Sequence, residues 1–150
     1  MKSVRAITIE IERAPGDVFA LLSDLAGFPS WLDPSSTYRA TVAVSDDPIV
    51  AGTTYTDEIQ GMRLYGTVFE CEPDRLLVFH QATKGDSLAI TIRYELHATA
   101  KGTQLVRTGI IATRGTLAAL HPIVVRTTAK ENARMMRVLK SHLEGTPSGN

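Results

Sequence analysis

The pattern of hydrophobic and polar positions begins with an alternation over residues 3–13, where three isoleucines are separated by polar residues. Alternation with β-branched residues is typical of a strand that is buried on one face. Pro15 ends the alternation, and hydrophobic residues then recur three and four positions apart. This spacing predicts a short helix over about 15–25, followed by a second helical turn over 28–32.

Six further strands are predicted between this turn and residue 113. Hydrophobic runs are separated there by short segments rich in Gly, Pro and Asp, which are turn signals. The predicted strands cover about 37–45, 52–60, 62–72, 75–84, 87–99 and 103–113. No connection is long enough for a crossover helix, so the strands are expected to pair antiparallel. The clearest alternation predicts an inward-facing set of Leu88, Ile90, Ile92, Tyr94 and Leu96.

After Gly115 the period changes to 3.6, which predicts one long helix over 117–143, with a kink or a start near Pro122. One face of this helix is mostly apolar and consists of Val125, Thr128, Asn132, Met135, Met136, Leu139 and Leu143. The nearly opposite face carries a basic stripe of Arg126, Lys130, Arg134, Arg137 and Lys140.

This order of elements predicts an α+β fold, with a seven-stranded antiparallel sheet wrapped around a long C-terminal helix. A single helix of about 40 Å lies across such a sheet but does not fill a strongly curved one. We therefore expect a hollow between the sheet and the helix, and hollows lined by apolar side chains bind small molecules.

Composition narrows the class of protein. A chain of 150 residues predicts one domain, here over 1–145 with a flexible tail at 146–150. Sixteen basic residues balance sixteen acidic ones, whereas a nucleic-acid binder usually has a large basic excess. The single cysteine excludes an intramolecular disulfide and a cysteine zinc cluster. With no secretory signal and no long apolar stretch, we expect a cytoplasmic protein without an integral membrane segment.

The zero net charge conceals an asymmetry. Residues 1–75 carry 6 basic and 12 acidic side chains, and residues 76–150 carry 10 basic and 4 acidic ones. Such an asymmetry marks either an interaction surface or two sides of one fold that neutralise each other.

Several segments together resemble a known family. They run from Ala14 to Asp24 (APGDVFALLSD), and over 28–31, 66–76, 102–105 and 139–144. In order and spacing they are similar to the START-like (SRPBCC) helix-grip superfamily, in its polyketide cyclase/dehydrase-like branch. The resemblance implies a sheet that grips a C-terminal helix around a hydrophobic cavity. Relatives in this superfamily include lipid and quinone binders and aromatase/cyclases, and the fold does not select among them.

Polar residues at core-facing positions are the first candidate site residues, because burial of a polar group is costly unless it is bonded or useful. Thr128 and Asn132 lie on the apolar face of the long helix. Either they point at a ligand, or Thr128 bonds back to the carbonyl of Val124 and Asn132 caps a strand end.

In the strand over 52–60, the alternation turns Tyr55, Asp57 and Ile59 inward. An inward Asp57 needs a partner, which Arg107 or His80 could supply. Arg107 faces inward only if Leu105 does, and a solvated arginine on the outer face is the more common arrangement.

Other side chains have a functional and a structural interpretation. His80 is either a general base for an aldol-type cyclisation or, as is more common, a half-buried histidine with one hydrogen bond. Tyrosine hydroxyls either meet a carbonyl or sit at the rim of the core. Phe28 and Trp31 either form a lid over the cavity or pack the two short helices against each other. The complete set of predicted ligand-binding residues is Phe28, Trp31, Tyr38, Tyr55, Asp57, His80, Tyr94, Arg107, Thr128, Asn132 and Met135, and Tyr65 is a further candidate phenol.

Three functions are compatible with these observations. The first is binding of a small hydrophobic or amphipathic ligand such as a lipid, a polyketide-like aromatic or an isoprenoid. The second is an aromatase/cyclase-type enzyme that uses the same cavity. The third is contact of the basic stripe with an anionic membrane or an acidic partner, although a solvated helix face explains that stripe as well. No metal or cofactor is expected, no nucleic-acid partner is expected, and homodimerisation stays open.

Overall fold

The computed structural model describes residues 1–35 and 37–145. Its strands are β1 (Lys2–Ile11), β2 (Tyr38–Val42), β3 (Thr54–Ile59), β4 (Met62–Glu72), β5 (Leu76–Ala82), β6 (Leu88–Ala98) and β7 (Thr103–Thr113). Its helices are α1 (Pro15–Ser23), the 3₁₀ helices η1 (Leu25–Ser30) and η2 (Gly115–Leu120), and the long α2 (His121–Gly145). The predicted tail at 146–150 lies outside the described residues.

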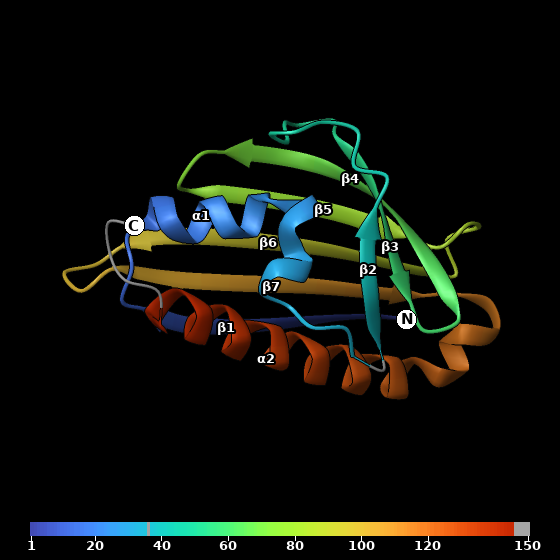
Figure 1. The fold of residues 1–150 in the computed structure, drawn as a ribbon. Coiled ribbons are helices and arrows are strands. Elements are labelled where there is room, and N and C mark those ends of the chain that lie inside the picture. The colour runs from blue at the N-terminus through green and yellow to red at the C-terminus, as the bar shows by residue number, and fades with distance from the viewer. Residues whose placement is uncertain (36, 146–150) are drawn as a thin grey trace.

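All seven strands form one antiparallel sheet in the order β1-β7-β6-β5-β4-β3-β2. Only β1 pairs out of chain order, because it lies against β7. Figure 1 shows α1 and α2 on the same side of the curved sheet, with α2 running along it. The predicted α+β architecture and the antiparallel pairing are confirmed.

The N-terminal end of α2 is attached to the sheet through the buried side chain of His121. Its Nε2 lies 2.7 Å from the hydroxyl oxygen of Ser3 on β1, and its Nδ1 lies 2.7 Å from that of Thr113 on β7. Pro122 follows at the first turn, where its missing N–H leaves no hydrogen bond unmade. The predicted alternative of a helix start near Pro122 is confirmed, because residues 115–120 form the separate helix η2 and α2 begins at His121.

The C-terminal end of α2 is attached to β1 and to the residues that follow it. Arg13 donates from Nη1 to the carbonyl of Leu143 at 2.9 Å, and the amide of Glu12 donates to the carboxylate of Glu144 at 3.0 Å. Lys140 donates to the carbonyl of Glu10. Both ends of the helix are thus bonded to the same edge of the sheet.

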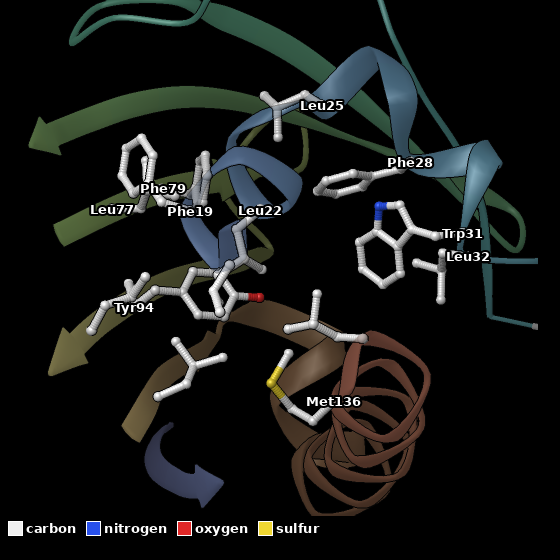
Figure 2. Packing of buried hydrophobic residues seen from close by; sticks show 14 of the residues in the cluster. Phe19, Leu22, Leu25, Phe28, Trp31, Leu32, Leu77, Phe79, Tyr94 and Met136 are labelled. Carbon is white, nitrogen blue, oxygen red and sulfur yellow. The ribbon is translucent and has the colours of Figure 1, made fainter. Parts of the chain in front are cut away.

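The fully buried residues of α2 lie only near its two ends. Val125 packs into a small apolar cluster with Leu64, Leu88, Ile90 and Ile111. Met136, Leu139 and Leu143 belong to the main core, together with aromatic residues from α1, η1, β5 and β6 (Figure 2). No helix residue between these two groups is fully buried. The middle of α2 therefore faces space that the core does not fill.

The basic stripe of α2 is less exposed than the helical pattern predicts. Arg126, Lys130 and Arg137 are exposed. Arg134 is half-buried in an ion pair with Glu131, and Lys140 is bonded to β1, so these two are not part of a free cationic surface. None of the helices described here is long and apolar enough to cross a membrane.

Leu139→Ala should lower the free energy of unfolding by about 2–5 kcal/mol, because Leu139 is 0% exposed and its loss leaves a cavity under α2. Ile123→Ala on the same helix is the matched control, since Ile123 is 59% exposed and its loss should cost under about 0.5 kcal/mol. Urea denaturation of both variants measures the difference, and equal losses would contradict this account of how α2 packs.

Candidate functional site

A cavity of about 140 Å³ lies between the sheet and the middle of α2. Strands β2 to β7 form its floor, η1 closes one side, and α2 covers it. Its lining is Leu25, Phe28, Leu32, Thr37, Tyr38, Thr41, Tyr55, Asp57, Ile59, Leu64, Phe79, Gln81, Leu88, Ile90, Ile92, Tyr94, Arg107, Thr128, Glu131, Asn132 and Met135. Thirteen of these 21 residues are aliphatic, aromatic or methionine and eight are polar or charged, so the cavity has a hydrophobic wall that carries several polar groups.

One polar group of the cavity is a chain of three side chains on β2 and β3. The hydroxyl of Thr41 donates to Oδ1 of Asp57 at 2.7 Å, and the hydroxyl oxygen of Tyr38 lies 2.7 Å from that of Thr41. Thr41 has a single hydroxyl proton, so Tyr38 donates to Thr41 whenever Thr41 donates to an ionised Asp57. The three groups form one directed hydrogen-bond chain that ends on the carboxylate.

The ionisation of Asp57 is perturbed. Burial raises the pKa of this carboxyl from 3.8 to about 6, although hydrogen bonds from Thr41 and Gln81 act in the opposite direction. Burial also raises the pKa of the Tyr38 phenol to about 12. Asp57 therefore changes charge near neutral pH, while Tyr38 stays a neutral donor.

Tyr55 and Gln81 extend this polar end. The hydroxyl of Tyr55 donates to Oε1 of Gln81 at 2.7 Å, and burial raises the pKa of the Tyr55 phenol well above its usual value. Gly66 lies opposite Tyr55 on β4, and a Cβ there would stand 2.2 Å from Cζ of the ring. Because Gly66 has no side chain, the ring of Tyr55 can lie flat across β4.

Arg107 provides a second polar group on the same face of the sheet, near its other edge. Leu105 and Arg107 both face inward on β7, so the more common outward arrangement does not apply here. The Nε of Arg107 donates to the hydroxyl of Tyr94 at 3.3 Å, and its guanidinium carbon lies 5.6 Å from the centre of that ring.

The predicted contact between Asp57 and Arg107 is not formed. Both side chains line the cavity, yet no ion pair joins them in the described part of the chain. Strands β6, β5 and β4 lie between β7 and β3, and Asp57 is bonded to Thr41 instead. The cavity therefore has a cationic end and an acidic end.

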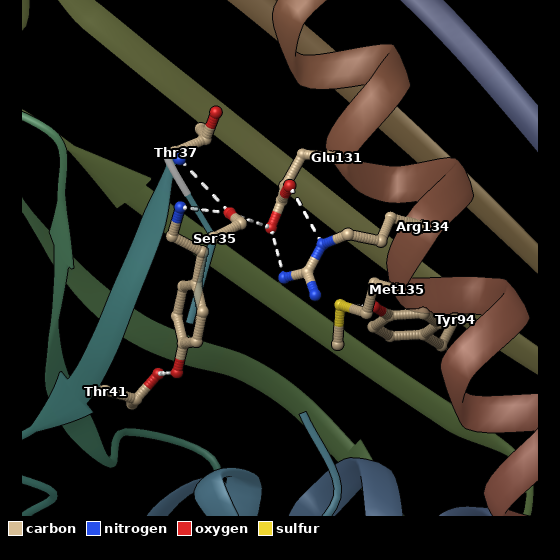
Figure 3. Close-up of polar contacts among 8 residues, drawn as sticks. Ser35, Thr37, Thr41, Tyr94, Glu131, Arg134 and Met135 are labelled. Atoms are coloured by element: carbon tan, nitrogen blue, oxygen red, sulfur yellow. Dashed lines mark hydrogen bonds and ion pairs between the residues drawn. The ribbon is translucent and has the colours of Figure 1, made fainter. Parts of the chain in front are cut away.

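A third polar group lies where α2 passes the loop before β2 (Figure 3). Ser35 donates to Oε1 of Glu131 at 2.9 Å, and Arg134 donates to both carboxylate oxygens of Glu131 at 2.7 and 3.2 Å. The amides of Thr37 and Tyr38 donate to the Ser35 hydroxyl oxygen at 3.1 and 2.9 Å. This group bonds α2 to the loop beside the cavity.

Nine predicted ligand-binding residues line the cavity, namely Phe28, Tyr38, Tyr55, Asp57, Tyr94, Arg107, Thr128, Asn132 and Met135. The alternative roles of Thr128 and Asn132, a back-bond and a strand cap, do not appear among the hydrogen bonds described. Trp31 is buried behind the wall, where its ring packs edge-on against Phe28 with ring centres 5.3 Å apart.

His80 lies outside the cavity, on the outer face of the sheet. The alternation of β5 turns Phe79 and Gln81 inward, so His80 must point the other way. Its ring stacks on exposed Phe69 with centres 5.2 Å apart, and its Nδ1 lies 3.1 Å from the hydroxyl oxygen of Thr91. The common half-buried arrangement therefore applies, and Tyr65 is likewise exposed outside the cavity.

Sequence reasoning missed Thr41, Gln81 and Glu131. Gln81 could have been found, because the alternation of its strand places it with Phe79. Thr41 needed the pairing register of β2 with β3, which no short-range pattern encodes. Glu131 is an ordinary polar residue until the loop at Ser35 is placed beside it. Within residues 1–35 and 37–145, no cluster of His, Cys, Asp and Glu could hold a metal ion.

Comparisons with known proteins support the fold. A family model described as polyketide cyclase / dehydrase and lipid transport matches residues 4–144. The Zhui aromatase/cyclase from Streptomyces sp. R1128 superposes with a TM-score of 0.80 at 13% identity, over 100% of this chain and 99% of that one. A START superfamily protein from Mycobacterium smegmatis gives 0.71 at 11%, over 95% and 97%. The predicted START-like resemblance is thereby confirmed.

The di-domain ARO/CYC StfQ from the steffimycin biosynthetic pathway gives a TM-score of 0.77 at 11% identity, over 96% of this chain. The match covers 51% of StfQ, so the chain spans about half the length of that protein. No curated protein matches the sequence.

Asp57→Asn should stabilise the protein at neutral pH by about 1–3 kcal/mol, because it removes a buried charge whose pKa lies near 6 instead of 3.8. Between pH 3.8 and about 6, Asp57 keeps its proton in the folded state and has lost it in the unfolded state. Wild-type stability therefore falls as pH rises from 4 to 7. The gain in Asp57→Asn should vanish near pH 4 and become constant above pH 7. Chemical denaturation across this range tests it, and a variant that is destabilised at pH 7.5 would contradict it.

Proposed function

Because the chain belongs to the polyketide cyclase / dehydrase and lipid transport family, we propose that it binds one small amphipathic molecule between the sheet and α2. The observation that carries this proposal is the gap in the packing under the middle of α2, where apolar walls meet polar groups at two ends of the cavity. Apolar walls with a few polar groups placed at the ends of the space are typical of small-molecule sites.

The size of the cavity favours a compact ligand. An apolar cavity of roughly 150 Å³ holds a single benzene ring, whereas sites for drug-sized molecules measure about 300–1,000 Å³. At about 140 Å³ the cavity matches a ligand with one ring, or the ring-bearing end of a longer molecule. Among the ligand classes expected from the sequence, this favours an aromatic or alicyclic group over an extended lipid chain.

Filling the cavity from α2 should abolish binding. Thr128→Phe places a ring in the cavity, whereas Thr127→Phe adds the same ring at the exposed neighbouring position. Titration with p-cresol, followed by NMR of labelled protein, should show saturable binding to wild type and to Thr127→Phe. Binding to Thr128→Phe should be at least tenfold weaker, since one ring excludes another.

The proposed function fails if p-cresol and a panel of other single-ring phenols, alcohols and acids produce no saturable shifts at the cavity residues. It also fails if Thr128→Phe binds p-cresol as tightly as wild type does while staying folded.

A second candidate is a cyclase-type enzyme that acts in the same cavity, and the raised pKa of Asp57 favours it. A carboxylate with a pKa of about 6 is ionised at neutral pH and is a stronger base than an ordinary aspartate. It could take a proton from the carbon beside a ketone carbonyl, while the electron pair of that C–H bond forms a C=C bond and the π pair of the carbonyl moves to its oxygen, which gives an enolate. The fold likeness to the Zhui aromatase/cyclase agrees with such a reaction.

The enzymatic candidate predicts exchange of ketone α-protons. Wild-type protein in D₂O should accelerate deuterium uptake at the methyl group of acetophenone, measured by proton NMR. Asp57→Asn should lose about 10²-fold of this acceleration, because the base is gone. Glu58→Gln, one position along on the opposite face of β3, should keep it. If wild-type protein exchanges these protons no faster than buffer does, the enzymatic candidate is wrong and only the binding role remains.

A further inference from the structure

Arg107 is a buried cation without a counter-ion. It is 3% exposed, and no carboxylate of the described residues lies within ion-pair distance of it. A charged group without a partner in a protein interior is strongly unfavourable. An arginine of this kind requires a reason other than the stability of the fold.

Neither acidic residue of the cavity wall satisfies this charge. Asp57 lies on β3, which three strands separate from β7, and it accepts a hydrogen bond from Thr41 on β2. Glu131 is bonded by both Arg134 and Ser35 at the loop before β2. The cationic end of the cavity is therefore uncompensated by the protein groups that surround the same space.

The guanidinium of Arg107 is held in place and is almost fully buried. Its Nε is bonded to the hydroxyl of Tyr94, and its Nη1 lies over Gly109, where a Cβ would stand 3.2 Å away. An arginine carries five N–H donors in a planar fork. In the described structure only Nε has a hydrogen-bond acceptor, which leaves the donors of both terminal nitrogens available at the cavity.

We propose that the ligand of this cavity carries a carboxylate, which Arg107 binds through its two terminal nitrogens while the ring of the ligand lies against the apolar wall. This inference rests on the proposed binding function and specifies the ligand class as small, ring-bearing monocarboxylic acids. The planar fork of arginine matches the two oxygens of a carboxylate. A phosphate dianion fits less well, because one cation would have to balance two charges in a cavity that also contains Asp57 and Glu131.

The test compares benzoate with benzamide, which has the same shape and no charge. At pH 7.5, wild-type protein should bind benzoate at least tenfold more tightly than benzamide in NMR titrations. Arg107→Met should bind benzoate about 30-fold more weakly than wild type, with benzamide changed less than threefold. Arg93→Met removes an exposed arginine from the outer face of β6 and should leave both affinities unchanged.

Phenyl phosphate distinguishes a carboxylate site from a general anion site, and should bind wild type more weakly than benzoate. If benzoate and benzamide bind wild type equally, or if Arg107→Met keeps the preference for benzoate, the carboxylate assignment is wrong while the cavity remains a binding site. If neither probe nor any other single-ring compound binds wild type, the proposed function itself is wrong.

Stability without ligand separates this role from a structural one. Arg107→Met should unfold at the same temperature as wild type or a higher one, because methionine removes a buried charge and fills similar space. A large fall in melting temperature in both Arg107→Met and Arg107→Lys would make Arg107 a residue that the fold needs, and would overturn the proposal.

Discussion

The attachment of both ends of α2 to the sheet determines whether the protein contains a cavity. His121 bonds the start of the helix to β1 and β7, and Arg13 bonds its last turn to the residues after β1. Between these points no side chain of the middle turns is fully buried, and the cavity lies between them and the curved sheet (Figure 1). A helix free to settle would pack its whole apolar face against the sheet and close the space.

The polar groups that face this space are separated along the sheet. Asp57 and its hydroxyl partners lie on the strands near one edge, and Arg107 lies on β7 near the other, with apolar residues of β5 and β6 between them. Two opposite charges that touched would neutralise each other and leave only an apolar pocket. Because they are separated, the cavity has one acidic end and one cationic end with an apolar wall between them.

Local sequence patterns predicted the elements and most of the cavity wall. The alternation in β6 and the helical spacing of α2 each define one apolar face, and the residues on those faces do point inward. The sequence pattern did not decide which way Arg107 points, because both faces of β7 carry apolar residues. Only the pairing of β7 with β1 and β6 shows which face is turned inward. His80 was likewise misplaced, because the sequence alone did not show which face of β5 points toward the cavity. Contacts such as Ser35 with Glu131 join segments 96 positions apart and leave no local signal.

Because α2 is attached at its two ends, its residues fall into two groups that tolerate substitution differently. Substitutions at Val125 or Leu139 alter buried packing and are penalised through stability. Substitutions at Thr128 or Asn132 alter the cavity wall, where little packing is lost. The lining of the cavity can therefore change while the architecture is retained. The superposition with Zhui aromatase/cyclase at 13% identity is the kind of divergence that such a division permits.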